Sequence, residues 1–188
     1  MDEQQILEQL REAAKADPSA MNDLGGAYSC GQFGLPVDPR ESCNWFQKAA
    51  AKNHPNACYN LACCYREGYG TEKNDELAVK WWKSGAEEKD VDCMFCLADA
   101  YAQGNGCAQS DKAAAKWYLK AGQYGHVCGA YEFGVRAWTG TGCSQDPFQA
   151  VKFFEWSAER GHLEAQFSLG NAFATGDGVA GKNMGIAV

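Results

Sequence analysis

Cysteine is the residue type that could take part in the most kinds of chemistry in this chain of 188 residues. The pair Cys93-x-x-Cys96 has the spacing of a metal-binding or disulfide-exchange motif. It lacks a second pair at ligand spacing, however, and it falls in the middle of a predicted helix. A free cysteine packs as a small hydrophobic residue, and the ten cysteines show no recurring pair. We therefore expect reduced thiols, no bound metal and no cofactor.

Histidine is the next candidate for catalysis or metal binding. His54, His126 and His162 are each predicted in the same kind of turn between helices, and Asp90 holds the equivalent place once. Equivalent positions in a stack of repeats form a row, so these side chains are not expected to cluster. The chain also lacks Ser-x-x-Lys, Gly-x-Ser-x-Gly, His-Glu-x-x-His and phosphate-binding glycine-rich motifs. These observations favour a protein without a catalytic site.

The elements that must position these side chains follow a period of 36 residues. Trp45, Trp81, Trp117 and Phe153 are spaced by this interval, and each is followed by a second aromatic residue: Phe46, Trp82, Tyr118 and Phe154. A polar residue suited to cap a helix opens each unit, and small residues flank the aromatic pair. A period of this length is typical of stacked helical hairpins, which bury their apolar faces against their neighbours.

A second helix in each unit is predicted by an aromatic residue, a large apolar residue two positions later and then a small one. These helices contain Tyr59-x-Leu61, Phe95-x-Leu97, Tyr131-x-Phe133 and Phe167-x-Leu169. A Gly-x-Gly segment follows each of them, at Gly68/Gly70, Gly104/Gly106, Gly140/Gly142 and Gly176/Gly178. Glycine just after a helix supplies a left-handed cap and a tight reversal. These glycines end helices and do not follow strands, which excludes a dinucleotide-binding fingerprint.

This combination of aromatic pair, small residues, Tyr/Phe-x-Leu-Gly/Ala and Gly-x-Gly resembles the Sel-one-like repeat, a relative of the tetratricopeptide repeat. The resemblance covers about residues 3–188. It implies an all-α fold, an α/α right-handed superhelix (solenoid) of about five helix-turn-helix repeats, with a concave groove used as an adaptor in protein complexes. Cys107 and Cys143 depart from the usual valine after Gly-x-Gly, and Ala137 departs from an aromatic. A secreted bacterial branch with a cysteine pair in every repeat does not fit.

Composition narrows the class of partner. The net charge is −7 and the isoelectric point is about 5.0, which argues against binding to nucleic acid or to an anionic membrane surface. The sequence has no run of 18 apolar residues, and its start, Met1-Asp2-Glu3-Gln4-Gln5, has neither the basic nor the apolar part of a secretory signal. We expect a cytoplasmic protein.

The whole of residues 1–188 is predicted as a single repeat domain, with units at about 3–37, 38–73, 74–109, 110–145 and 146–181. Residues 182–188 are predicted to begin a further helix, and the next aromatic pair falls due just after Val188. Phe167, Leu169 and Phe173 would then lack a complete neighbour. We expect either a longer array or self-association through the C-terminal end.

Two tryptophans break the repeat and are candidate anchors for a partner. Trp156 replaces the polar residues of its sibling positions, and Trp138 replaces mostly small ones, with Arg136 close by in sequence. The alternative is helix packing peculiar to this unit. Lysines recur at the exact period, at Lys80, Lys116 and Lys152. They form either a solvated face or a basic stripe that suits an acidic peptide.

The sequence as a whole predicts a non-enzymatic scaffold or adaptor that binds another protein or peptide in its concave groove. One alternative is a bacterial immunity protein that covers a toxin, for which an acidic surface would suit a basic toxin. A hydrolase is the alternative from another class, although no nucleophile is placed with a base.

Overall fold

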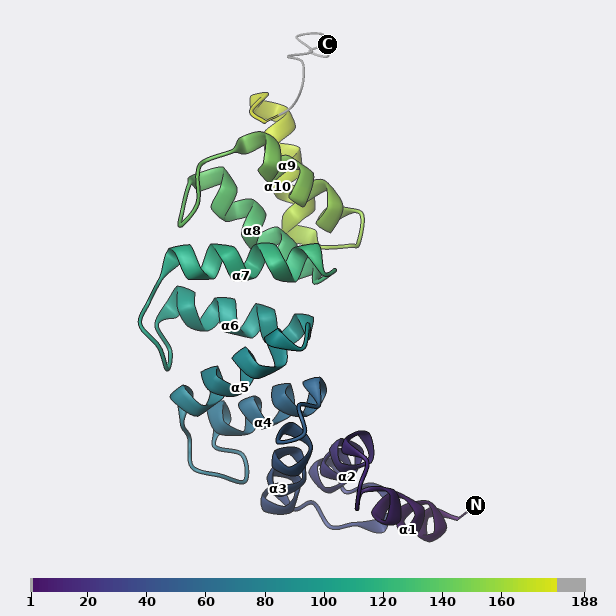
Figure 1. The fold of residues 1–188 in the computed structure, drawn as a ribbon. Helices are drawn as coiled ribbons and strands as arrows, with labels where there is room; N and C mark the ends of the chain where they lie inside the picture. The colour runs from purple at the N-terminus through teal and green to yellow at the C-terminus, as the bar shows by residue number, and fades with distance from the viewer. Residues whose placement is uncertain (1, 179–188) are drawn as a thin grey trace.

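Ten α-helices make up most of residues 2–178, the part of the chain that this computed structural model describes. They are α1 (Glu3–Ala13), α2 (Pro18–Cys30), α3 (Pro39–Ala50), α4 (Pro55–Glu67), α5 (Asp75–Glu87), α6 (Val91–Gln103), α7 (Asp111–Gln123), α8 (Val127–Thr139), α9 (Pro147–Ala158) and α10 (Leu163–Thr175). One short 3-10 turn, η1 (Gln32–Gly34), lies between α2 and α3. The helices stack one after another from the N-terminal to the C-terminal end (Figure 1).

The stack is bent, with its even-numbered helices on the inner side. Each helix packs mainly on its neighbours in sequence, but α4 also contacts α6, and within residues 2–178 no two odd-numbered helices pack as closely. Asn60 on α4 donates a hydrogen bond through Nδ2 to Oδ1 of Asn22 on α2, at 3.0 Å. We call the solvent-facing side of α2, α4, α6, α8 and α10 the even-helix face.

Polar caps begin the odd-numbered helices where the period predicts them. A side-chain oxygen of each cap accepts a hydrogen bond from a backbone N–H of the first turn, at Asp38, Asn74, Ser110 and Asp146. Pro39 and Pro147 occupy the first helical position, where their missing N–H leaves no hydrogen bond unmade.

The second glycine of each Gly-x-Gly segment lies against the first turn of the odd-numbered helix that precedes the segment. Gly106 has φ +69°, and a Cβ at this position would lie 2.2 Å from the carbonyl oxygen of Asp75, the first residue of α5. Only glycine allows the loop backbone to come this close to the helix. The same approach recurs at Gly70, Gly142 and Gly178.

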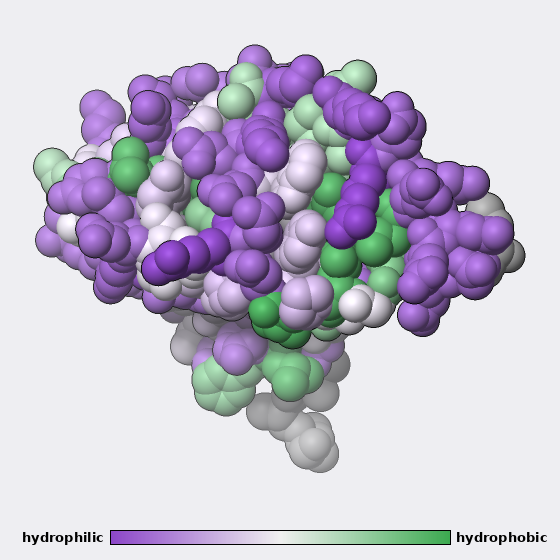
Figure 2. Space-filling model, turned by 90° about the horizontal axis from the view of Figure 1, so that it is seen from below, coloured by the Kyte–Doolittle hydropathy of each residue, from purple (hydrophilic) through white to green (hydrophobic). Residues whose placement is uncertain are grey.

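The second aromatic of each pair fills the core between repeats. Phe46, Trp82, Tyr118 and Phe154 are all buried, and leucines of the even-numbered helices, Leu24, Leu61 and Leu97, are fully buried. Seen from below, the molecule is mostly hydrophilic, with hydrophobic side chains gathered toward its N-terminal end (Figure 2).

The all-α stack of helical hairpins confirms the fold that the sequence predicts. The further helix predicted at 182–188 lies outside the described residues. Within residues 2–178, every helix is too short or too polar to cross a membrane.

Candidate binding face

Charged side chains on the even-helix face are mostly acidic. The even-numbered helices carry the carboxylates Asp23, Glu67, Asp92, Asp99, Glu132 and Glu164 and the cations Arg66 and Arg136. Both cations are already engaged, since Arg66 pairs with Glu67 at 2.9 Å and Arg136 pairs with Asp111 at 3.3 Å. The face therefore carries negative charge that a basic partner could neutralise.

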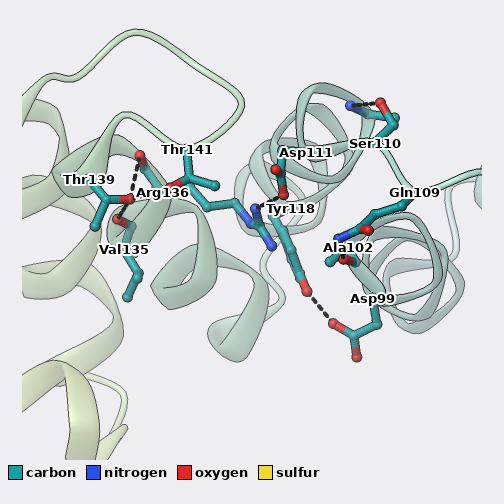
Figure 3. Close-up of polar contacts among 11 residues, drawn as sticks. Asp99, Ala102, Gln109, Ser110, Asp111, Tyr118, Val135, Arg136, Thr139 and Thr141 are labelled. Carbon is teal, nitrogen blue, oxygen red and sulfur yellow. Dashed lines mark hydrogen bonds and ion pairs between the residues drawn. The ribbon is translucent and has the colours of Figure 1, made fainter. Parts of the chain in front are cut away.

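A polar cluster joins α6, α7 and α8 (Figure 3). The hydroxyl of Tyr118 donates a hydrogen bond to Oδ1 of Asp99. The guanidinium of Arg136 lies over the Tyr118 ring, with Cζ 5.0 Å from the ring centroid, while its Nη1 donates to Oδ1 of Asp111. Tyr118 thus contacts an acid at its hydroxyl end and a cation on its ring face, which fixes the position of both.

Two half-buried carboxylates in this region, Asp99 and Glu132, make no ion pair within residues 2–178. Burial raises the pKa of Asp99, an effect that the hydrogen bond from Tyr118 opposes, together with the nearby charges of Arg136 and Arg66 and, when it is protonated, of His126. Burial also raises the pKa of Glu132, and the negative charge of Asp99 raises it further. Partial burial of an unpaired charge disfavours its ionised form, and an incoming ammonium or guanidinium group would remove that cost.

Pockets along this face could receive side chains. One of about 330 Å³ lies among α4, α5 and α6 and is lined in part by Arg66, Trp82, Cys96 and Asp99. A second, of about 260 Å³, lies between α8 and α10 and is lined by Tyr131, Val135, Trp138, Phe154, Ser168 and Asn171. The first is mainly polar and the second mainly apolar in its lining residues. An extended segment that crosses both would need a polar and an apolar side chain.

The three histidines cap helices on this face. Nδ1 of each accepts a hydrogen bond from a backbone N–H of the first turn, at His54 for α4, His126 for α8 and His162 for α10. Asp90 does the same for α6. They lie in a row along the stack, as the sequence predicts, and their hydrogen bonds give them a structural role.

Aromatic residues of the preceding repeat pack on these caps. The His126 ring stacks on Phe95 with centroids 4.4 Å apart, and His162 stacks on Tyr131 at 4.5 Å. Burial lowers the pKa of His126, so it is neutral at neutral pH and does not compensate the nearby charge of Asp92, 3.4 Å away.

The structure separates the six residues that the sequence singles out. Trp138 and Arg136 are on α8, and Trp138 lines the apolar pocket of the even-helix face. Arg136 has only 13% of its side chain exposed because it packs on Tyr118. Its sibling positions are small and buried: Ala27, Cys64, Ala100 and Ala172. This arginine therefore holds the cluster together and offers a partner little surface.

The remaining candidates lie on odd-numbered helices, away from that face. Trp156 and Lys152 on α9 line one pocket of about 300 Å³ with Phe153, and the Arg160 guanidinium lies 3.9 Å from the Trp156 ring centroid. Lys80 on α5 and Lys116 on α7 are exposed. The lysine row and the acidic face are thus two different surfaces.

Sequence reasoning missed Asp99, Glu132 and Tyr118 as members of one site. Asp99 and Glu132 occupy different positions of the repeat, and single acidic residues at sibling positions look like ordinary solvated groups. The signal that could have found them is the offset between neighbouring repeats. Asn60 and Asn22 show it, because they also occupy different repeat positions and still hydrogen bond.

All ten cysteines are free in the structure. Burial raises the pKa of Cys96, to about 12, and the pKa of Cys63, which describes unreactive thiols. Within residues 2–178, no three His, Cys, Asp or Glu side chains come together as they would around a metal ion.

Comparison with known proteins identifies the family to which this chain belongs. The model of the Sel1 repeat matches five times, at residues 18–54, 55–90, 91–126, 129–162 and 163–188. The first four matches each join an even-numbered helix to the odd-numbered helix after it, half a period from the units that the sequence suggested. A search of curated protein sequences gave no match.

Solved structures share the fold over most of the chain. A Sel1 repeat protein from Oxalobacter formigenes is 30% identical with a TM-score of 0.81, covering 90% of this chain and 66% of its own. The protective antigen c5321 of uropathogenic Escherichia coli, which displays an SLR fold, is 29% identical with a TM-score of 0.90, covering 95% of this chain and 38% of its own. Cysteine rich protein B of Helicobacter pylori shares the fold alone. It is 22% identical with a TM-score of 0.57, covering 71% of this chain and 96% of its own. This chain thus spans less than two thirds of c5321 and about two thirds of the Oxalobacter protein.

Proposed function

Since this chain belongs to the Sel1 repeat family, we propose that it is a non-enzymatic scaffold that holds an extended segment of a partner protein along its even-helix face. Sel1 repeat solenoids are typical of protein interaction scaffolds and are generally non-enzymatic. We propose no catalytic role, no cofactor and no nucleic-acid or membrane ligand for it. We also propose that it acts in the cytoplasm.

The observation that carries the proposal is a pair of half-buried carboxylates, neither of which makes an ion pair in the described part of the chain. Asp99 and Glu132 lie on neighbouring even-numbered helices, and burial raises the pKa of both. A scaffold gains nothing in its own stability from such groups, because leaving them unpaired costs free energy. The cost is recovered if the partner segment places a lysine or arginine between them. We therefore propose a basic partner segment with an aromatic or aliphatic residue for the pocket beside Trp138.

Binding of short synthetic peptides tests this proposal. The probes are a fluorescent peptide of alternating lysine and tyrosine and its glutamate-tyrosine counterpart, both of about ten residues. The lysine peptide should bind in low salt and weaken as salt rises, and the glutamate peptide should not bind the even-helix face. Glu132→Gln and Asp99→Asn should each weaken binding of the lysine peptide about five-fold, the size expected when one partly screened charge pair worth about 1 kcal/mol is lost.

A matched variant separates this site from general charge attraction. Glu155→Gln on α9 removes the same charge from an exposed position of an odd-numbered helix. It should leave the affinity nearly unchanged. Equal weakening by Glu155→Gln, or tighter binding of the glutamate peptide, would count against a basic segment on the even-helix face.

The residues chosen from the sequence enter the same assay. We propose Trp138 as the apolar anchor, so Trp138→Ala should weaken the lysine-tyrosine peptide. Arg136 is proposed as a positioning residue for Asp99. We propose a separate surface for an acidic peptide, made by Trp156, Lys80, Lys116 and Lys152. If the glutamate peptide binds there, Lys116→Ala and Trp156→Ala should each lower its affinity.

A second candidate is an immunity protein that covers the active site of a basic toxin. The net charge of −7 and the acidic even-helix face favour it. A folded toxin domain would bury a larger area than a peptide, so full-chain binding with no affinity for the peptides would favour this function.

A further inference from the structure

Two pockets of the even-helix face lie at equivalent places of the stack, two repeats apart. The polar pocket, of about 330 Å³, is lined in part by Arg66, Trp82, Cys96 and Asp99. The apolar pocket, of about 260 Å³, is lined in part by Trp138, Phe154, Ser168 and Asn171. Each residue of the second set follows its counterpart in the first by two periods of 36 residues. The fold therefore forms the same pocket twice and lines it with different side chains.

The repeat between these pockets has the same place, and Arg136 occupies it. Tyr118 is the buried aromatic there, as Trp82 is in the polar pocket and Phe154 in the apolar one. The Arg136 guanidinium lies over the Tyr118 ring, with Cζ 5.0 Å from the centroid, and only 13% of its side chain is exposed (Figure 3). One period earlier, the position of Arg136 is held by Ala100, which lines the polar pocket and leaves it open. An arginine thus fills in one repeat the space that an alanine leaves open in another.

The acid that pairs with Arg136 is repeated as well. Nη1 of Arg136 lies 3.3 Å from Oδ1 of Asp111. Asp75 occupies the same position one period earlier and lines the polar pocket, where Lys73 lies 3.6 Å from it. An arginine at position 100 would therefore find a carboxylate in the place that Asp111 has around Arg136. One side chain, at position 100 or 136, decides whether this place is open or filled.

The polar pocket suits a basic side chain of the partner. Its two cations are already paired, since Arg66 lies 2.9 Å from Glu67 and Lys73 lies 3.6 Å from Asp75. Asp99 also lines the pocket and makes no ion pair within residues 2–178. A lysine or arginine that enters the pocket would supply the missing cation.

The apolar pocket suits a tyrosine. The ring would meet Trp138 and Phe154, and the hydroxyl would have Ser168 and Asn171 as hydrogen-bond partners. The equivalent polar pocket is open although the next helix, α7, packs on α6. The apolar pocket therefore does not require α10 to be the last helix of the stack.

The distance between the pockets sets the spacing of two such anchors. The polar pocket lies among α4, α5 and α6, and the apolar pocket lies two even-numbered helices further along, between α8 and α10. Packed helices are about 8–10 Å apart, so about 16–20 Å separates the pockets. An extended chain advances about 3.3 Å per residue and covers this span in about five or six residues.

We propose that the partner segment carries two anchors about five or six residues apart, a basic residue for the polar pocket and a tyrosine for the apolar one, and that Arg136 closes the place between them. This inference rests on the function proposed above and adds the spacing that the partner must have.

Two synthetic peptides test the spacing. Each has one lysine and one tyrosine in a glycine-serine background, with the anchors about six residues apart in the long-spaced peptide and about three apart in the short-spaced one. Each is made in both orders, so that either chain direction is covered. Fluorescence anisotropy in low salt measures Kd. In one of the orders, wild-type protein should bind the long-spaced peptide at least about five-fold more tightly, because the short-spaced peptide reaches only one pocket.

Two reciprocal variants should abolish this preference in opposite ways. Ala100→Arg fills the polar pocket as Arg136 fills the middle place, so the long-spaced peptide should weaken about five-fold. Arg136→Ala opens the middle place, where Glu132 is the counterpart of Cys96, so the short-spaced peptide should tighten about five-fold. The ratio of the two affinities is the readout, because a change in net charge alone affects both peptides alike.

The fold of each variant is checked by urea unfolding. Each substitution introduces the residue that a neighbouring repeat has at the same position, alanine or arginine, so both should fold. If Arg136→Ala is too unstable to assay, Ala100→Arg still decides the question.

The possible results separate this inference from the proposed function. Binding of the alternating lysine-tyrosine peptide, with equal affinities for the two spaced peptides, would keep the proposed function and overturn the spacing. An affinity ratio that both folded variants leave unchanged would overturn the role of positions 100 and 136. Failure of every lysine peptide to bind would refute the proposed function and this inference together.

Discussion

Replacing Glu132 by glutamine should stabilise the free protein, although it weakens binding of a basic segment. Glu132 is half-buried beside Asp99 on α6 and has no ion pair within residues 2–178. Arg136, one turn away on the same helix, pairs with Asp111 instead. His162 caps the next even-numbered helix and also faces Glu132. Glutamine keeps the shape of the side chain and removes the charge that burial and Asp99 disfavour.

The size of the effect follows from the exposure of the group. A fully buried polar group without a partner costs about 1–3 kcal/mol, and solvent screens the half-exposed Glu132, so we take the lower end, about 1 kcal/mol. For a domain of this length such a gain raises Tm by about 2–4 °C. Because the folded-state pKa of Glu132 is raised, its stabilising contribution is present below the ordinary glutamate pKa of about 4.3 and is lost as pH rises through the folded value. The advantage of the variant should therefore grow from pH 4 to pH 7.5.

Urea unfolding followed by circular dichroism at both pH values measures this difference. Glu155→Gln removes a charge from an exposed site and should change the free energy of unfolding by less than about 0.5 kcal/mol at either pH. A Glu132→Gln protein that is less stable than wild type at pH 7.5, or a difference that does not change with pH, would refute the view that this carboxylate is held at a cost.

Two further predictions concern the repeat itself. Gly106→Ala should lower the free energy of unfolding by at least about 3 kcal/mol, because it adds a clash with the Asp75 carbonyl to the strain of positive φ; Gly125→Ala, at φ +100° with open space around it, should cost only about 1–2 kcal/mol, and equal losses in thermal or urea unfolding would contradict the proposed backbone contact. Thiol titration of unfolded protein prepared without reductant should find close to ten free thiols, and four or five disulfides would contradict both the reduced state and the cytoplasmic expectation.

The fold could be predicted from the sequence because capping residues and glycines mark the ends of the helices in each repeat. Asp38 and Asn74 identify helix starts by their ability to accept backbone hydrogen bonds, and both do so in the structure. Gly68 and Gly104 identify helix ends, and both adopt the left-handed cap. These signals need only residues a few positions apart, so a single sequence reveals them.

The candidate site was harder to predict because it joins different positions of neighbouring repeats. Comparison of equivalent positions found Trp138, which lines a pocket of the even-helix face. It could not find that Asp99 lies near Glu132, since that depends on the offset between helices. It also treated Arg136 as a surface residue, whereas its small buried siblings, such as Ala100, place it against Tyr118. The equivalent positions of the other repeats hold small residues, and this fact indicates that Arg136 is buried. Its closeness to Trp138 in sequence does not.

The contact between Gly106 and the carbonyl of Asp75 has a consequence for how such a protein can change over evolutionary time. The distance between the loop after α6 and the start of α5 is set there by a contact between two backbone segments. No side chain of the even-helix face takes part in this contact. Residues of the even-helix face such as Glu132 and Trp138 can therefore be exchanged without removing this backbone contact. Duplication of one 36-residue unit would also carry its own spacer with it. New partners can be acquired by substitution on a surface whose geometry is inherited unchanged.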